Sequence, residues 1–136
     1  MKKHVLLSLF LLSFLVSCTD NNLPDVDGMW QLKTIEEKTG HIQPVDTIYY
    51  SFQAQKLFTF TRLNVGVSQF EPMCVAYGYV DFPTKNTMLI QMDISGAGFF
   101  SLLLWQSESV TYSIQKLTSK EMVLENEGDV YRFIKF

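Results

Sequence analysis

Few residues of this chain could do chemistry. It contains two histidines, His4 and His41, and two cysteines, Cys18 and Cys74. His41 stands in a Lys-Thr-Gly-His-Ile-Gln-Pro stretch typical of a turn, where a histidine is usually solvated. Cys74 stands in an apolar stretch, which favours a small buried residue over a nucleophile. No Ser-His-Asp or Cys-His arrangement can be assembled, so the sequence does not indicate an enzyme.

Metal and cofactor chemistry are not indicated either. No Cys/His spacing suits zinc, and no glycine-rich phosphate loop follows a strand. Glu36 and Glu37 are neighbours, and adjacent residues of a strand point to opposite faces, so they cannot flank one substrate. The chain carries a formal charge of -3 with no Lys/Arg cluster, which argues against a nucleic-acid partner. We expect no catalytic residue, no metal and no cofactor.

The N-terminal residues have the pattern of a secretory signal peptide. A basic Met1-Lys2-Lys3 precedes an apolar run from Val5 to Val16, which is too short to span a bilayer comfortably. The run ends in Leu15-Val16-Ser17-Cys18, which resembles the lipobox of bacterial lipoproteins. The resemblance implies cleavage before Cys18, diacylation of its thiol and, usually, acylation of the new amino group. An ordinary secretory signal with a chance cysteine is the alternative.

The lipobox resemblance divides the chain into three parts. Residues 1–17 would be the signal peptide, residues 18–27 a mobile lipid-anchored linker, and residues 28–136 one domain. The mature chain would keep about 119 residues and a charge of about -5, since Lys2 and Lys3 leave. Two or three acyl chains would hold it on a membrane. Thr19 does not resemble an inner-membrane retention signal, so we expect the outer membrane, on a side that the sequence leaves open.

From Gly28 onward, the pattern predicts strands separated by turns. Apolar and polar residues alternate with period two, and aromatic and β-branched residues are frequent. About eight strands follow at spacings of roughly 8–12 residues, as in a sandwich or an up-and-down barrel. Short links without a long crossover favour the barrel. The clearest alternation covers residues 47–52, 58–61, 88–93, 110–115 and 121–125.

Two features resemble the lipocalin and calycin families. Gly28-Met29-Trp30 opens the first predicted strand, and the last stretch, "YSIQKLTSKEMVLENEGDVYRFIKF", is similar to the closing strands of lipocalin-like domains of bacterial lipoproteins. The resemblance implies an all-β fold, an eight-stranded antiparallel up-and-down barrel over residues 28–136. It also implies that Trp30 plugs the barrel floor and that a late arginine, here Arg132, packs across its ring. Both residues would be structural.

Such barrels commonly bind small apolar molecules, so the resemblance implies a small hydrophobic or amphipathic ligand. In "CVAYGYVDF", Asp81 belongs in water, which turns the small residues of the same strand inward and leaves space beside them. A filled barrel that serves as an envelope interaction module, such as an inhibitor or assembly partner, is the alternative. We expect a monomer. The predicted cavity lining is Tyr50, Phe52, Phe58, Phe60, Cys74, Ala76, Gly78, Met88, Ile90 and Tyr112.

One apolar segment has no clean period. Residues 95–106, "SGAGFFSLLLWQ", do not fit the lipocalin pattern. The segment is interpreted as core, with an apolar lid or docking patch as the alternative. In the cavity hypothesis, the run Phe99–Trp105 flanks the mouth of the barrel.

Overall fold

The computed structural model describes residues 23–64, 73–93, 105 and 107–136. These residues form β-strands joined by turns and short loops. Within the described part, no helix has the length and hydropathy needed to cross a membrane. Buried and exposed side chains alternate along the strands, as the period-two pattern predicts. In chain order the strands are β1 (Gly28–Glu36), β2 (Ile42–Pro44), β3 (Ile48–Gln53), β4 (Leu57–Leu63), β5 (Met73–Thr84), β6 (Thr87–Met92), β7 (Ser109–Leu117), β8 (Glu121–Asn126) and β9 (Asp129–Lys135).

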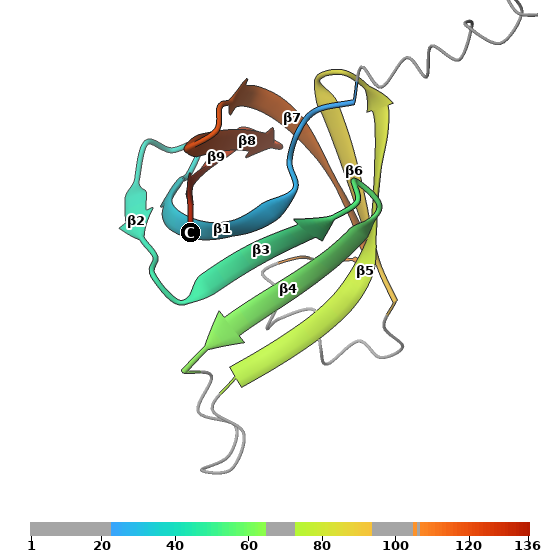
Figure 1. The fold of residues 1–136 in the computed structure, drawn as a ribbon. Helices are drawn as coiled ribbons and strands as arrows, with labels where there is room; N and C mark the ends of the chain where they lie inside the picture. Colours follow the sequence, from blue (N-terminus) through green and yellow to red (C-terminus); the bar gives the residue numbers. More distant parts are fainter. Residues whose placement is uncertain (1–22, 65–72, 94–104, 106) are drawn as a thin grey trace, which may run out of the picture.

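The strands form one antiparallel sheet that closes on itself (Figure 1). Their order is β2-β1-β3-β4-β5-β6-β7-β8-β9, and β1 also pairs with β9. The short strand β2 pairs with the last residues of β1, so the other eight strands make the barrel. Consecutive barrel strands are antiparallel neighbours. The predicted eight-stranded up-and-down barrel is confirmed.

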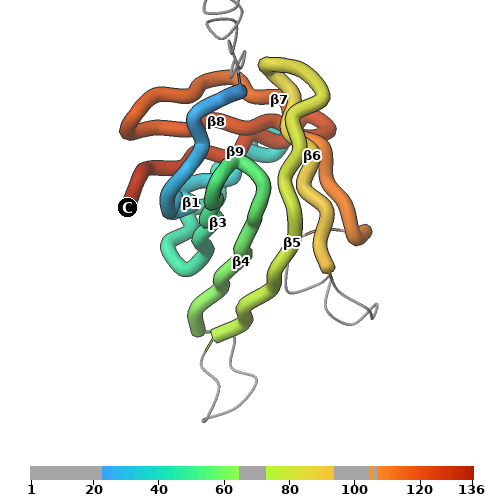
Figure 2. The backbone as a smooth tube through the Cα atoms, turned by 45° about the vertical axis from the view of Figure 1, so that its right-hand side comes forward, coloured from blue at the N-terminus to red at the C-terminus, as the bar shows by residue number. Residues whose placement is uncertain are grey.

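The antiparallel order gives the barrel two different ends (Figure 2). We call one end the floor: β1 begins there and β9 ends there. The β3–β4, β5–β6 and β7–β8 turns lie at the same end. At the other end, which we call the mouth, β4 ends, β5 begins, β6 ends and β7 begins. The turn between β8 and β9 also lies at the mouth. Residues 65–72 and 94–104, which connect strands at that end, lie outside the described residues.

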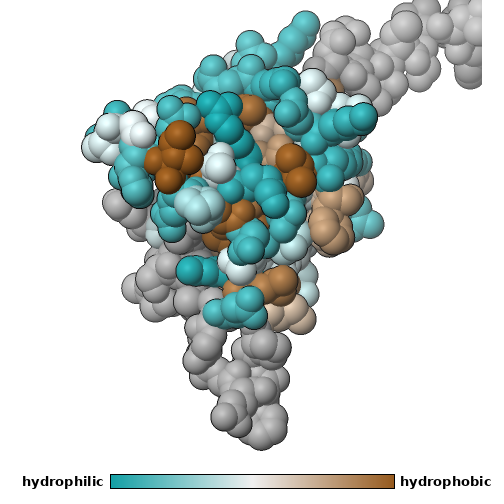
Figure 3. Space-filling model, turned by 90° about the vertical axis from the view of Figure 1, so that its left-hand side faces the viewer, coloured by the Kyte–Doolittle hydropathy of each residue, from teal (hydrophilic) through white to brown (hydrophobic). Residues whose placement is uncertain are grey.

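The outer surface is mixed in character. Figure 3 views the side of the barrel on which β2 lies, and its hydrophobic side chains stand in small separate groups among hydrophilic ones. Ile42 of β2 is one of the exposed hydrophobic residues. An exposed hydrophobic residue of this scattered kind is ordinary on a soluble protein surface.

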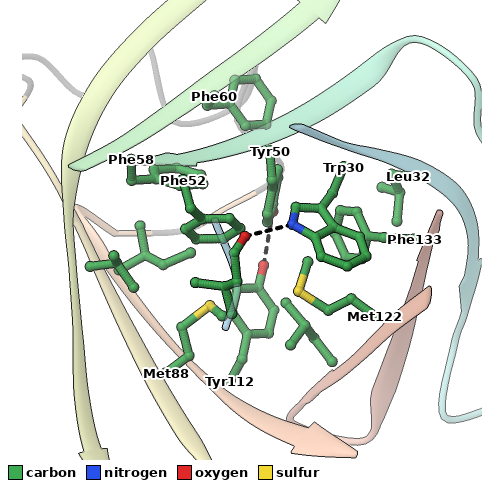
Figure 4. Close-up of a cluster of buried hydrophobic side chains, with 14 of the residues drawn as sticks. Trp30, Leu32, Tyr50, Phe52, Phe58, Phe60, Met88, Tyr112, Met122 and Phe133 are labelled. Atoms are coloured by element: carbon green, nitrogen blue, oxygen red, sulfur yellow. Dashed lines mark hydrogen bonds between the residues drawn. The ribbon is translucent and has the colours of Figure 1, made fainter. Parts of the chain in front are cut away.

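The interior is filled by hydrophobic side chains from all eight barrel strands. Figure 4 shows aromatic rings and methionines converging between the strands. Within the described residues, no buried side-chain nitrogen or oxygen lacks a hydrogen-bond partner. The largest side chains buried almost completely are Trp30, Tyr112, Phe58, Phe60, Phe133, Leu32, Met88, Ile90, Met122, Leu124 and Val26.

The segment before β1 packs on the floor. The sequence predicts a linker over residues 18–27, and the structure describes this segment from Leu23 onward. Val26 is completely buried, and the Asp27 carboxylate accepts a hydrogen bond of 2.8 Å from the backbone N–H of Gln55. Val26 and Asp27 are therefore held against the barrel, whereas the sequence predicts a mobile linker as far as residue 27, because Val26 is buried and its carbonyl accepts the hydrogen bond of Trp30.

Candidate ligand site in the barrel interior

The residues predicted to line a cavity lie inside the barrel. Tyr77 and Tyr79 of β5 point outward with exposed fractions of 65% and 58%, so the opposite face of that strand looks inward. Asp81 is exposed, as its charge requires. The buried positions include all ten predicted residues: Tyr50, Phe52, Phe58, Phe60, Cys74, Ala76, Gly78, Met88, Ile90 and Tyr112.

The space expected beside the small residues of β5 is smaller than the sequence suggests. A Cβ atom at Gly78 would lie 2.4 Å from the backbone oxygen of Gln91 in β6. Gly78 therefore permits two backbones to approach closely and does not open a volume. Its register partner on the other side is Phe58, and that of Ala76 is Phe60, so large rings stand opposite the small residues.

Three polar aromatic side chains meet in the interior, and we call them the aromatic centre: Tyr50, Tyr112 and Trp105. The two tyrosine oxygens lie 3.0 Å apart, a hydrogen bond drawn in Figure 4. Trp105 Nε1 donates to both oxygens, at 3.2 Å each. Tyr50 is on β3 and Tyr112 is on β7, so the barrel brings together residues from opposite walls.

Aromatic rings pack around this centre. The Trp105 ring is stacked on Phe58 with centroids 5.9 Å apart, and Phe60 meets its edge at 6.3 Å. The Tyr50 ring lies 4.8 Å from that of Phe133. The Trp105 indole thus fills the space between these rings and the two tyrosine hydroxyls. Of the run expected to flank the mouth, residues 99–104 lie outside the described residues, and Trp105 is buried within the barrel.

Burial keeps the central hydroxyls neutral. It raises the pKa of Tyr50 and that of Tyr112 well above the ordinary tyrosine value, because water no longer solvates the phenolate. Tyr131, whose ring meets Tyr112 at 5.4 Å, also has a raised pKa, from its burial and from the charges of Asp129 and Glu127. The centre therefore offers neutral O–H groups that both donate and accept hydrogen bonds.

A rim pocket of about 540 Å³ leads toward the aromatic centre from the mouth. Its inner lining includes Trp105 and Tyr131, and its outer lining is polar and includes the carboxylates of Glu127 and Asp129. The volume is within the usual range for small-molecule sites. The remaining lining residues are Ser107, Ser109, Val110, Thr111 and Asn126.

Cys74 and His41 are the other candidate groups named by the sequence. Cys74 is free and buried, and burial raises the pKa of its thiol, although the Arg62 charge opposes this shift. A neutral thiol is a poor nucleophile. His41 lies exposed after β1, where its carbonyl accepts a bond of 2.8 Å from the backbone N–H of Glu37. Among the described residues, no three His, Cys, Asp or Glu side chains are placed to hold a metal ion.

The floor is closed by Trp30, but the expectation for Arg132 is wrong. Trp30 is completely buried, and its Nε1 donates to the Val26 carbonyl at 2.7 Å. Arg132 is exposed and pairs with Glu36 at 3.2 Å. The cation over the Trp30 ring is Lys135, whose Nζ lies 4.7 Å from the ring centroid.

Strand parity explains the exchange of Arg132 for Lys135. Phe133 of β9 points inward, so Lys135 shares its face and Arg132 lies on the opposite one. Lys135 is the register partner of Trp30, and its ammonium donates to the Asp27 carbonyl. Gly28 makes room for the lysine stem, because a Cβ there would lie 2.6 Å from Lys135 Cε.

Comparison with known proteins agrees with this architecture. The model of a lipocalin-like domain family matches residues 11–136. The chain belongs to the lipocalin-like domain family. Its fold is similar to the crystal structure of a lipocalin-like protein from Bacteroides uniformis (TM-score 0.70, 22% identity, covering 82% of this chain and 99% of that one). It is also similar to an uncharacterized protein from Bacteroides eggerthii (TM-score 0.69, 25% identity, covering 82% and 100%).

No curated protein sequence matches the chain. The lipocalin-like fold is typical of binding proteins, because an eight-stranded barrel is just wide enough to be filled by side chains or to hold one small ligand. In this lipocalin-like barrel, the Trp105 side chain lies against the two tyrosine hydroxyls of the aromatic centre.

The sequence prediction omits Lys135 and places Trp105 at the mouth of the barrel, whereas Trp105 is buried in the interior. Lys135 could have been found from parity, because Tyr131, Phe133 and Lys135 alternate on one face. Trp105 had no comparable signal, since its segment lacks a period of either kind. The partnership of Tyr50 with Tyr112 also had no local signal, since it depends on which strands face each other across the barrel.

Proposed function

We propose that this protein is a lipid-anchored cell-envelope protein whose lipocalin-like barrel binds a small hydrophobic or amphipathic molecule at the aromatic centre. The observation that carries this proposal is the pair of buried hydroxyls of Tyr50 and Tyr112. They bond to each other, and both also accept a hydrogen bond from the indole of Trp105. A polar pair inside an apolar interior is the usual means by which a barrel orients a ligand.

The indole shows what kind of molecule would fit. It presents a planar apolar ring to Phe58 and one N–H to the two hydroxyls. A ligand with a planar or compact apolar body and one hydrogen-bonding group would make the same contacts after displacing Trp105. The ligand would leave no buried hydroxyl unpaired, which avoids a cost of about 1–3 kcal/mol.

The rim pocket indicates the polar end of the ligand. Glu127 and Asp129 bring negative charge to the outer lining, and they contribute to the raised pKa of Tyr131 nearby. A carboxylate or phosphate at this place would be repelled, whereas a neutral or cationic group would be attracted. We therefore propose an amphipathic ligand whose polar end is neutral or positively charged.

The proposed anchor suits this direction of entry. Lipid on Cys18 would hold the protein on a membrane, and we propose the outer membrane. Val26 is buried at the floor, and the eight steps from Cys18 to Val26 span at most about 27 Å. An anchor at the floor would direct the mouth away from the membrane. The ligand would then come from the aqueous side.

The binding proposal is tested with three small molecules that share a phenyl ring and differ in the polar end: phenethylamine (cationic), 2-phenylethanol (neutral) and phenylacetate (anionic). Calorimetry would measure their binding to the wild type and to Trp105→Ala. We expect the amine and the alcohol to bind both proteins. Trp105→Ala should bind about tenfold more tightly, because no indole competes, and phenylacetate should bind weakest.

Matched variants separate the parts of this proposal. Glu127→Gln with Asp129→Asn should remove the preference for the amine over phenylacetate and leave the alcohol unchanged. Tyr50→Phe with Tyr112→Phe should weaken the alcohol. If none of the three molecules binds either protein at millimolar concentration, the binding proposal fails. The filled barrel of an envelope interaction module then becomes the better account. The anchor is tested separately by mass spectrometry of the membrane-extracted protein, and an unmodified Cys18 would reject it.

A further inference from the structure

A second pocket, of about 360 Å³, lies on the outer wall of the barrel over β3, β4 and β5, and we call it the outer groove. Ser51 and Thr59 are register partners and lie half-buried between larger neighbours. Thr59 pairs in turn with Tyr77, and Leu57 pairs with Tyr79, so the two tyrosines stand side by side along one edge. Its outward-pointing lining is Ser51, Gln53, Leu57, Thr59, Tyr77, Tyr79 and Asp93.

The two tyrosines of this outer groove are largely exposed. Tyr77 and Tyr79 are two residues apart on β5, which places their Cα atoms about 6.6 Å apart on the same face. In the described structure, neither ring packs on another ring and neither hydroxyl is bonded to a side chain. Tyr49, on the same outer surface, differs: its ring meets Phe136 at 5.5 Å, and its hydroxyl accepts a bond of 3.1 Å from Gln31.

The chemistry of the lining limits what could bind there. Its polar groups are the hydroxyls of Ser51 and Thr59, the amide of Gln53 and the carboxylate of Asp93. No lysine or arginine is among the described lining residues, so phosphates, nucleic acids and acidic polymers have no counter-charge. A purely apolar ligand would leave the polar groups without partners. The lining suits a neutral molecule with many hydroxyls and flat apolar faces.

Sugars have this combination of properties. The C–H face of a pyranose ring packs on an aromatic ring, and its equatorial hydroxyls bond to amides, carboxylates and hydroxyls. We propose that the outer groove binds a short neutral carbohydrate, with successive sugar rings on Tyr77 and Tyr79 and sugar hydroxyls bonded to Gln53 and Asp93. This site is distinct from the aromatic centre, because the side chains of Tyr77 and Tyr79 point away from the barrel interior.

The test titrates the full chain with neutral oligosaccharides: cellohexaose, laminarihexaose, maltohexaose and mannohexaose. Polygalacturonate serves as the acidic comparison, and binding is measured by calorimetry. We expect at least one neutral hexasaccharide to bind and polygalacturonate not to bind. Tyr77→Ala and Tyr79→Ala should each weaken binding about tenfold through loss of stacking, while Tyr77→Phe and Tyr79→Phe should retain it.

Two controls keep this result separate from the barrel site. Ile42→Ala removes an exposed hydrophobic residue on β2, away from the groove, and should not change sugar binding. Tyr77→Ala should bind 2-phenylethanol as the wild type does, so the two proposals can fail independently. The sugar proposal is overturned if none of the four hexasaccharides binds at millimolar concentration. It is also overturned if binding is equal in the wild type, Tyr77→Ala and Tyr79→Ala.

Discussion

The floor and the aromatic centre satisfy their polar atoms in different ways. At the floor, Trp30 Nε1 donates to the Val26 carbonyl, and Lys135 Nζ donates to the Asp27 carbonyl. At the aromatic centre, hydroxyls and an indole N–H bond to one another. Backbone carbonyls are fixed by the fold, whereas a side-chain partner can be replaced by a ligand that supplies the same groups. In the proposed function, the floor stays closed, and the contacts of Trp105 at the centre are exchanged for those of a ligand.

The largest effect is expected at the floor. Trp30→Ala removes a completely buried ring, the bond to Val26 and the support of Lys135. We expect the free energy of unfolding to fall by about 3–5 kcal/mol, measured by chemical denaturation. Trp30→Phe, which keeps a ring, should lose less. A loss below about 1 kcal/mol for Trp30→Ala would show that the floor does not depend on this residue.

The matching change at the aromatic centre should be milder. Trp105→Ala is expected to cost about 3 kcal/mol, the low end for a buried tryptophan, because Tyr50 and Tyr112 keep the bond between their hydroxyls. The same denaturation experiment gives the difference between the two variants. If Trp105→Ala loses as much as Trp30→Ala or more, then Trp105 is as structural as the floor and the proposed exchange is not supported.

Alkaline pH should act on the centre selectively. In the unfolded chain tyrosines ionise near pH 10, and burial raises the pKa of Tyr50 and Tyr112 above that value. The folded state therefore keeps protons that the unfolded state loses. The free energy of unfolding is therefore unaffected by the ionisation of these tyrosines below about pH 10. It falls as the pH rises above that value, by up to about 1.4 kcal/mol per pH unit for each tyrosine. Between about pH 9 and pH 11.5, the free energy of unfolding should decline less steeply in Tyr112→Phe than in the wild type. An equal decline in the two proteins would contradict the raised pKa of Tyr112.

The two cations of β9, Lys135 and Arg132, provide the smallest contrast. Lys135→Ala should lower the free energy of unfolding by about 1 kcal/mol, because the ammonium lies over Trp30 and bonds to Asp27. Arg132→Ala should cost less than about 0.5 kcal/mol, since its ion pair with Glu36 is exposed to water. The reverse order of the two losses would restore Arg132 to the role that the sequence suggested.

The sequence was sufficient for features that depend on period two. Alternation within each strand predicted the barrel, and the charge of Asp81 predicted the inward face of β5, with Ala76 and Gly78 inside. The same rule, applied to β9, would have placed Lys135 rather than Arg132 over Trp30. The family resemblance favours Arg132, whereas strand parity favours Lys135, which is the residue found over the Trp30 ring.

Other features depend on contacts that no local pattern encodes. The distance between Tyr50 and Tyr112 follows from the closure of β1 on β9, which brings β3 opposite β7. The sequence predicts space beside Gly78, but the backbone of Gln91 on the neighbouring strand fills it. The burial of Trp105 agrees with the core interpretation of its segment, whereas its place beside Tyr50 and Tyr112 has no local signal, because the segment is aperiodic.

The most direct test of the exchange at the aromatic centre is the fluorescence of Trp105. In Trp30→Phe, Trp105 is the remaining tryptophan of the chain, and its emission reports whether the indole is buried or in water. On titration with 2-phenylethanol, excited at the red edge of tryptophan absorption, the emission should shift to the red and become accessible to iodide quenching, in a saturable manner. An emission that stays blue and protected while calorimetry shows binding would contradict the account, because the ligand would then bind without displacing Trp105.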